Sequence, residues 1–263
     1  MSELPTFPLI AVDIGNTQMK LGRFDELPSD DGLPQPSATL QLETQQWEPL
    51  EIALWLAPRR PAEVCWRIAS VQADAAARLA DWLAVERADE RAKLLAHDDL
   101  PLDIELLEPH TVGIDRLLGA VAANRLRDAT RAAIVVDLGS AITVDAVSAR
   151  GSFLGGAILP GIGMASRALT EFTHLLPDVG LTELADPPPA LGTSTHEAIG
   201  SGIYWGAIGA IRLLIERLRR ELEGQPQLFL TGGAAPRVAA ELGDDVRFEP
   251  HLILAGLVLG SLE

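Results

Sequence analysis

The sequence predicts an α/β protein built from two similar domains. Short apolar runs, typical of buried strands, alternate along the chain with longer stretches of helical periodicity. A repeat supports the same conclusion: residues 11–17 and 135–141 share the pattern Val-Asp-(Ile or Leu)-Gly followed by a small polar residue, 124 positions apart. Each copy stands between two apolar runs, so each half of the chain is expected to open with the same β-hairpin.

The first half predicts a hairpin followed by helices and strands. The apolar run 9–12 leads into the first turn, and apolar residues from Met19 to Phe24 mark the returning strand. Residues 25–46 are polar and carry four prolines or glycines, which predicts a long connection or a sheet edge. The other elements expected in this half are helix 47–56, strand 64–71, helix 73–85 and helix 113–126.

The second half predicts strands at 134–136 and 143–147, on either side of the repeated turn. The elements expected after them are an apolar glycine-rich run 153–159, helix 166–175, a rigid proline loop 187–189, helix 197–222, strand 228–230, turn 231–233, helix 235–242 and helix 252–259. The expected domains are therefore residues 1–128 and 129–263, and the last helix could pack back on the first domain.

The composition excludes several classes of protein. Among 263 residues, 37 are acidic and 21 basic, and a net charge of −16 argues against a nucleic-acid binder, which needs clustered Lys and Arg. The single cysteine, Cys65, cannot form an internal disulfide. The N-terminus lacks the basic segment of a secretion signal, and the longest apolar stretch, 252–259, is too short to span a membrane. We expect a cytoplasmic protein that binds neither nucleic acid nor membrane.

Each repeated turn places an aspartate at the end of a buried strand, which is costly unless a cation or hydrogen-bond donors satisfy it. The glycine two positions later lets the chain reverse and lets backbone N–H groups approach an anion. Two such turns facing each other would hold the phosphates of a nucleotide, with the carboxylates on Mg²⁺. A third turn, Thr231-Gly232-Gly233, leaves room for a base and ribose. For any one of these turns alone, a plain structural turn is the alternative.

The motifs, in this order, resemble those of type III pantothenate kinases. They are Asp13-Ile14-Gly15-Asn16-Thr17, Gly113-Ile114-Asp115-Arg116, Asp137-Leu138-Gly139-Ser140-Ala141, Gly155-Gly156-Ala157-Ile158-Leu159-Pro160-Gly161 and Thr231-Gly232-Gly233. The family belongs to the superfamily of acetate and sugar kinases, heat-shock chaperones and actin. The resemblance implies two ribonuclease H-like domains with the active site in the cleft between them. It also implies transfer of the ATP γ-phosphate to the 4′-hydroxyl of pantothenate, the first step of coenzyme A synthesis.

The resemblance also implies roles for single residues. Asp115 would be the general base, because a carboxylate within reach of an alcohol can accept its proton. Arg116 would hold the pantothenate carboxylate or the transferring phosphate. Asp13 would orient Mg²⁺ through the phosphates, and Asp137 would bind a monovalent cation, K⁺ or NH₄⁺. The residues expected to contact ATP are Asp13, Ile14, Gly15, Asn16, Thr17, Gln18, Met19, Lys20, Ser140, Gly232 and Gly233.

The substrate site shows one departure from the family pattern. Its expected residues are Leu106, Gly113, Ile114, Asp115, Arg116 and Thr195. The family commonly has a tyrosine where Leu106 stands, so substrate binding could be weaker or the substrate changed. Ser140 replaces the usual threonine but keeps the hydroxyl group.

The resemblance further implies a homodimer, with part of the substrate site at the dimer interface. The sequence allows two alternatives. The chain could be a catalytically weak regulatory homologue of the Bvg accessory factor type, or another small-molecule kinase of the same superfamily. The intact aspartates and the Gly-Ile-Asp-Arg motif favour the pantothenate kinase.

Overall fold

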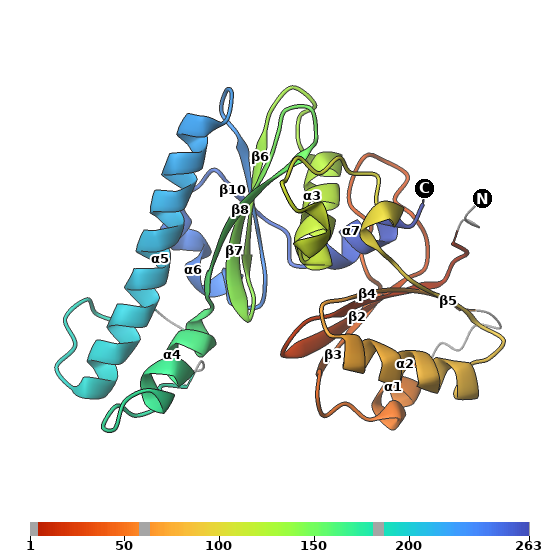
Figure 1. Cartoon of the computed structure of the whole chain (residues 1–263), viewed down its shortest axis with the longest axis horizontal. Helices are drawn as coiled ribbons and strands as arrows, with labels where there is room; N and C mark the ends of the chain where they lie inside the picture. The colour runs from red at the N-terminus through yellow and green to blue at the C-terminus, as the bar shows by residue number, and fades with distance from the viewer. Residues whose placement is uncertain (1–4, 58–63, 181–186, 263) are drawn as a thin grey trace. The chain divides into compact units, whose positions relative to one another are not determined.

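The structure is a computed structural model that describes residues 5–57, 64–180 and 187–262. The start of the N-terminal segment, in which the sequence predicts no targeting signal, lies outside these residues. The chain forms two compact units, one made of Met1–Leu126 with His251–Glu263 and the other of Arg127–Pro250. Each unit is an α/β unit around its own five-stranded sheet (Figure 1).

The sheet of unit 1 has the strand order β3-β2-β1-β4-β5. The first three strands, β1 (Leu9–Ile14), β2 (Gln18–Phe24) and β3 (Ala38–Glu43), form an antiparallel meander. Strands β4 (Cys65–Ser70) and β5 (Arg91–Leu94) run parallel to β1. All six residues of β1 are buried, as expected for a central strand that is covered on both faces.

Alternation along β1 decides which side chains face which helices of unit 1. Ile10, Val12 and Ile14 pack in one apolar cluster with α1 (Pro49–Leu56) and α2 (Ala73–Glu86). Because successive side chains of a strand point to opposite faces, Ala11 and Asp13 face the other side. That side is covered by α3 (Ile114–Leu126) and α7 (Leu252–Gly260), which contact β4 and β1 respectively.

The last helix belongs to unit 1 although the predicted second domain, 129–263, included it. Helix α7 is apolar all round and packs between β1 and α3, which buries nearly every one of its residues. Gly256 permits this packing, because a methyl group there would overlap the backbone of Leu118 in α3. The return of the chain to the first sheet thus follows from the burial of an apolar helix.

The sheet of unit 2 repeats this arrangement in the order β10-β9-β6-β7-β8. Strands β6 (Ala133–Leu138), β7 (Ala141–Val147) and β8 (Phe153–Pro160) form the antiparallel meander, and β9 (Gln227–Thr231) and β10 (Val246–Phe248) run parallel to β6. Helices α4 (Ile162–Glu171), α5 (Thr195–Glu221) and α6 (Ala235–Leu242) pack on one face of it (Figure 1). The repeated hairpin of the sequence therefore opens two sheets of the same topology.

Several elements differ from the sequence expectation. Helix α4 starts at Ile162 rather than 166, because Gly161 begins it and Ile162, Ala165 and Leu169 place one apolar face on the core. Strand β3 lies in the segment 25–46 and is the edge of its sheet. The short strands β5 and β10 were not predicted; β5 alternates little in burial and β10 has only three residues.

Helix α5 is the one helix in the described ranges that is long and apolar enough to cross a membrane. Its buried residues, from Ile199 to Ile215, pack in the apolar cluster of unit 2 against β6, β7 and α6. A long core helix accounts for this composition.

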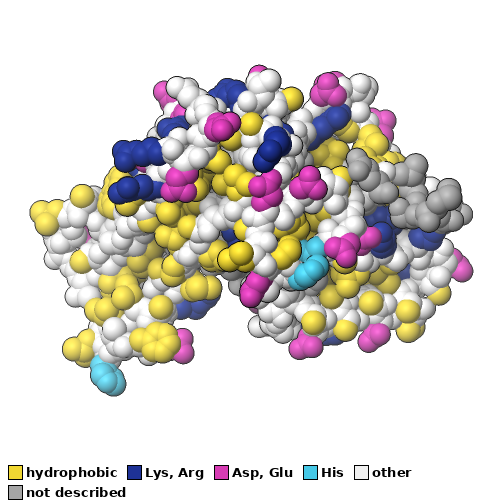
Figure 2. Space-filling view, turned by 45° about the horizontal axis from the view of Figure 1, so that its top comes forward, with side chains coloured by type: hydrophobic (Ala, Val, Ile, Leu, Met, Phe, Trp, Pro, Cys, Tyr) yellow, Lys and Arg dark blue, Asp and Glu magenta, His cyan; other side chains and the backbone are white. Residues whose placement is uncertain are grey.

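Charged side chains of both signs are mixed on the surface. Figure 2 shows acidic and basic groups interspersed on the viewed face.

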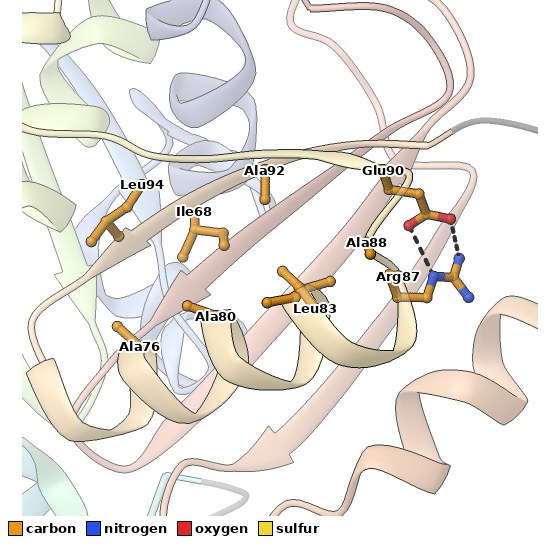
Figure 3. Close-up of a pocket in the computed structure, with 10 residues that line it drawn as sticks. Ile68, Ala76, Ala80, Leu83, Arg87, Ala88, Glu90, Ala92 and Leu94 are labelled. Carbon is orange, nitrogen blue, oxygen red and sulfur yellow. Dashed lines mark hydrogen bonds and ion pairs between the residues drawn. The ribbon is translucent and has the colours of Figure 1, made fainter.

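A groove of about 280 Å³ lies between α2 and the strands β4 and β5 (Figure 3). Its wall on α2 is made of small side chains, Ala76, Ala80 and Ala84, which leave space above Ile68. At one end, Arg87 and Glu90 form an ion pair with Nη2 and Oε1 2.7 Å apart. None of the predicted site residues lines this groove.

The close crossing of α3 and α7 predicts the effect of enlarging Gly256. Gly256→Ala should lower the free energy of unfolding by about 1–3 kcal/mol, because the added methyl group overlaps the Leu118 carbonyl. Gly202→Ala is the matched control, since Gly202 lies on the exposed face of α5 with open space around it and should gain about 0.5–1 kcal/mol. Denaturant unfolding of both variants checks this, and equal effects would contradict the packing account.

A second prediction concerns His251, the half-buried residue directly before α7. Burial lowers the pKa of His251 below its usual range, and the charge of Lys20 lowers it further. His251 therefore binds a proton more readily in the unfolded chain than in the folded one. Its contribution to the free energy of unfolding is complete above about pH 6.5 and is lost as the pH falls below that value. In His251→Gln, the drop in melting temperature between about pH 7.5 and about pH 5.5 should be smaller than in the wild type. An unchanged drop would count against this assignment.

Candidate functional site

The first turn joins β1 to β2 and follows directly on Asp13. Asp13 is 8% exposed and stands opposite Lys20 in the β1–β2 register. The turn is closed by a hydrogen bond from the Gly15 N–H to the Gln18 carbonyl, 3.0 Å. A buried carboxylate thus lies beside a tight turn, at the carboxyl end of the central strand.

The predicted ATP residues of this turn divide by exposure. The side chains of Asn16, Thr17 and Gln18 are exposed, and Lys20 is half-buried. Ile14 and Met19 are fully buried in the apolar cluster with α1 and α2. Only the backbone of these two residues is therefore placed to meet a ligand.

The residues that follow β4 hold the turn through two hydrogen bonds. The Val71 N–H donates to the Ile14 carbonyl at 3.0 Å, which joins the ends of β1 and β4. The Gln72 Nε2 donates to Asn16 Oδ1 at 2.8 Å. Gln72 is the residue that begins α2, and its N–H is bound by Ser70 Oγ at 2.9 Å. Sequence reasoning missed Gln72, because its partner lies 56 residues away.

The motif Gly113-Ile114-Asp115-Arg116 forms the start of α3, on the same face of the sheet as Asp13. A methyl group on Gly113 would overlap Asp115 Oδ1 and would lie 3.6 Å from Val71 Cγ1. Asp115 Oδ1 accepts the Arg116 N–H at 2.9 Å. Asp115 and Arg116 are both half-buried, and Ile114 is buried. The glycine therefore gives the Asp115 carboxylate its space near the end of β4.

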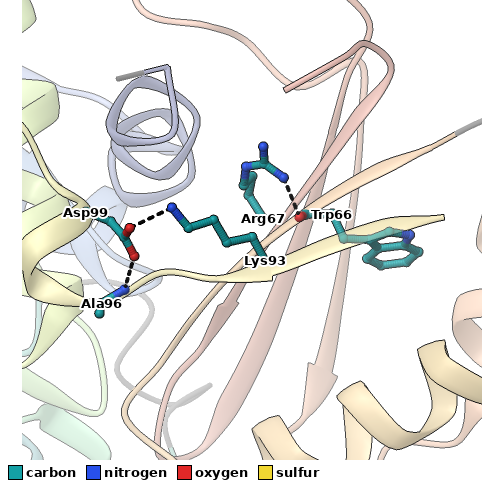
Figure 4. Close-up of polar contacts among 5 residues, drawn as sticks. All are labelled: Trp66, Arg67, Lys93, Ala96 and Asp99. Carbon is teal, nitrogen blue, oxygen red and sulfur yellow. Dashed lines mark hydrogen bonds and ion pairs between the residues drawn. The ribbon is translucent and has the colours of Figure 1, made fainter. Parts of the chain in front are cut away.

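The segment before α3 is held by polar contacts. His97 Nε2 lies 2.7 Å from the Val112 carbonyl and donates to it. Asp99 accepts the Ala96 N–H at 2.8 Å and Lys93 Nζ at 2.6 Å (Figure 4). The Ala96 N–H, followed by Lys93, lowers the pKa of the Asp99 carboxyl below its usual value. These bonds fix the backbone that leads into Gly113.

Leu106 lies in this same segment and is half-buried, whereas its neighbour Leu107 is fully exposed. Sequence reasoning also missed His97 as a contact of the motif. A histidine 15 residues before Val112 gives no signal in the sequence pattern.

The second turn joins β6 to β7 in unit 2. Asp137 is the penultimate residue of β6, and the Gly139 N–H donates to the Ala141 carbonyl at 3.0 Å. The third turn meets it: the Ala234 N–H donates to the Leu138 carbonyl at 3.2 Å. Gly232 has a φ of +98°, and a methyl group there would overlap Asp137 Oδ1 and the Leu138 backbone. The structure therefore brings Asp137, Ser140, Gly232 and Gly233 onto two adjoining turns.

Thr195 stands apart from these two turns. It is the exposed first residue of α5, and Ser194 before it caps the helix by accepting the Glu197 N–H at 3.2 Å. Across the residues that the structure describes, no hydrogen bond joins Thr195 to the other predicted site residues. Its predicted contact with substrate stays a prediction.

The carboxylates of the two hairpins suit a cation that takes most of its ligands from a bound substrate and few from the protein. In the described parts of the chain, no three His, Cys, Asp or Glu side chains gather into a metal site. Each hairpin instead offers one carboxylate, Asp13 or Asp137, beside a glycine turn. Mg²⁺ prefers oxygen ligands and commonly takes one or two carboxylates together with substrate phosphates, which suits Asp13.

Comparisons with known structures agree with this fold. Ethanolamine utilization protein EutJ from Carboxydothermus hydrogenoformans is similar with a TM-score of 0.53 and 15% identity, covering 100% of this chain and 92% of that one. The Lmo2764 protein from Listeria monocytogenes gives a TM-score of 0.53 and 17% identity, covering 97% of this chain and 98% of that one. With the strand order repeated in both units, these likenesses confirm the predicted pair of ribonuclease H-like domains.

Comparisons with known sequences identify the family. The family model described as type III pantothenate kinase matches residues 9–217. A type III pantothenate kinase from Chlorobaculum parvum is 33% identical over 96% of this chain and 94% of its own length. One from Anaeromyxobacter sp. is 34% identical over 95% of this chain and 96% of its own length.

Other relatives match over a shorter region. One from Parafrankia sp. is 43% identical, but the match covers 57% of this chain and 58% of the relative. The match to the Acidiphilium cryptum relative covers 65% of that protein. The residues matched by the family model span both aspartate turns and the Gly-Ile-Asp-Arg motif. The chain belongs to the type III pantothenate kinase family.

Proposed function

We propose that this protein transfers the γ-phosphoryl group of ATP to the 4′-hydroxyl of pantothenate, the first step of coenzyme A synthesis. Membership of the family supports an ATP-dependent pantothenate kinase. The observation that carries the proposal is the placement of Asp115. It lies at the start of α3, on the face of the sheet that also bears Asp13, near the carboxyl ends of β1 and β4.

In this proposal, Asp115 accepts the proton of the attacking hydroxyl group. Phosphoryl transfer needs little covalent help from the protein, and positioning and charge supply most of the catalysis. Gly113 gives the carboxylate its space, and the Arg116 N–H holds one of its oxygens. The other carboxylate oxygen of Asp115 can accept a hydrogen bond from the hydroxyl group of the substrate. The planar guanidinium of Arg116 suits either the pantothenate carboxylate or a phosphate.

Each unit offers its own candidate groups for binding ATP. In unit 1, Asn16, Thr17 and Lys20 offer donors next to Asp13. In unit 2, Ser140 offers a hydroxyl group, and Gly233 has open space around it for the nucleoside. Mg²⁺, when bound to the phosphates, would neutralise part of their charge. Asp13 is the carboxylate proposed to orient that ion.

Three further features belong to the proposal. Asp137 is proposed to bind a monovalent cation, because its carboxylate lies against the glycine backbone of two turns. We also propose a homodimer, with part of the substrate site at its interface, and a cytoplasmic location. The family resemblance supports all three.

Pantothenate-dependent ADP formation by the wild type, with and without K⁺, tests the function. We expect turnover that needs pantothenate and that falls when K⁺ is replaced by a larger organic cation. No turnover with pantothenate would favour a regulatory homologue of the Bvg accessory factor type. Turnover with a different alcohol alone would favour another small-molecule kinase.

Asp115→Asn should lower kcat by about 100- to 10,000-fold, because the amide cannot accept the hydroxyl proton. Asp74→Asn is the matched control, since Asp74 is also an aspartate in the first turn of a helix, α2, and it is exposed. Its kcat should stay within about twofold of the wild type. Steady-state kinetics with pantothenate check both. Full activity of Asp115→Asn would remove Asp115 as the base.

Gly232→Ala should raise the KM for ATP about tenfold or more, because its methyl group displaces Asp137 and Leu138 at the nucleotide turn. Gly224→Ala controls for backbone strain: Gly224 also has a positive φ, of +73°, but has open space around it. Gly224→Ala should lose about 1–2 kcal/mol of stability from its backbone conformation alone, Gly232→Ala should lose more because of the overlap, and only Gly232→Ala should change the KM for ATP. An equal effect of both on that KM would contradict a role for this turn.

A further inference from the structure

The residue that follows the third strand of each sheet holds the aspartate turn of that sheet. In unit 2 this residue is Gly161, after β8, and its N–H donates to the Ser140 carbonyl at 3.2 Å. In unit 1 it is Thr44, after β3, and its N–H donates to the Thr17 carbonyl at 2.9 Å. Thr17 and Ser140 both stand directly before the second strand of their hairpin, so the two contacts are equivalent.

The two holding residues differ in the space they fill. A methyl group on Gly161 would overlap the Ser140 carbonyl, so the backbone lies directly on the turn. The turn of unit 1 has one residue more, from Gly15 to Gln18 against Gly139 to Ala141. Thr44 reaches it with its side chain: Oγ1 donates to the Gly15 carbonyl at 2.8 Å, and the residue is fully buried.

The hydroxyl of Thr44 therefore sets the orientation of a peptide group in the turn. A trans peptide directs its C=O and N–H to opposite sides. Because the Gly15 carbonyl bonds to Thr44, the N–H of Asn16 points away from Thr44. Backbone N–H groups of such turns bind anions only when they are held in the right direction. Gln72 holds the Asn16 side chain from the other neighbouring element.

We infer that Thr44 is a positioning residue for the phosphates of ATP, acting through the turn 15–17 and not by contact with the nucleotide. The inference rests on the proposed function, since it assigns this turn to ATP. It also predicts a specific pattern: loss of the hydroxyl weakens ATP binding and leaves pantothenate binding unchanged. A merely structural threonine would affect neither substrate selectively.

The test compares Thr44→Val, which keeps the shape but removes the hydroxyl, with Thr44→Ser, which keeps the hydroxyl. Binding of ATP with Mg²⁺ is measured by calorimetry without pantothenate, and KM values for both substrates are measured by steady-state kinetics. Thr44→Val should raise the Kd and KM for ATP by about five- to twentyfold, with the KM for pantothenate within about twofold. Thr44→Ser should restore most of the ATP affinity.

The inference is overturned if folded Thr44→Val binds ATP as tightly as the wild type, or if Thr44→Ser is as impaired as Thr44→Val. The calorimetry keeps this result separate from the proposed function. A wild type that binds ATP without phosphorylating pantothenate would end the proposed function, and the comparison of ATP affinities would still decide the role of Thr44. A wild type that binds no ATP would overturn both.

Discussion

The structure depends on an aspartate near the end of the first strand of each sheet, which is buried in the case of Asp13 and half-buried in the case of Asp137. Asp13 and Asp137 occupy the penultimate position of β1 and β6, beside a turn that must reverse the chain at once. A carboxylate in this place is costly unless a cation or hydrogen-bond donors satisfy it. The surrounding elements hold the turns from outside: Thr44 and Gln72 in unit 1, and Gly161 in unit 2.

The sequence predicted the fold well because its signals are local and repeated. The Val-Asp-(Ile or Leu)-Gly pattern identified both hairpins, and helical periodicity placed α2, α3, α5 and α6. Strands β5 and β10 escaped prediction because they are short and mostly exposed, so their sequences carry little alternation. The sequence could not decide whether α7 packs on the first or the second sheet, because an apolar helix can be buried against either one.

The sequence could name a candidate residue where the motif itself contains the reactive group, as with Asp115, whose role stays a prediction. The structure adds the supporting residues, and these could not be predicted, since each lies far from its partner in the chain. Thr44 bonds to Gly15 across 29 residues, and His97 to Val112 across 15. Ile14 and Met19 were predicted to contact ATP because they belong to the motif or follow it closely in the sequence. The fold buries their side chains, so only their backbone could make this contact.

In the proposed reaction, the γ-phosphoryl group of ATP ends on the 4′-hydroxyl of pantothenate. The most direct measurement incubates the protein with pantothenate and γ-labelled ATP, separates the products, and locates the label by phosphorus NMR and mass spectrometry. The account predicts labelled 4′-phosphopantothenate in amounts equal to the ADP formed. Label found only in inorganic phosphate or unreacted ATP, with pantothenate unchanged, would contradict it.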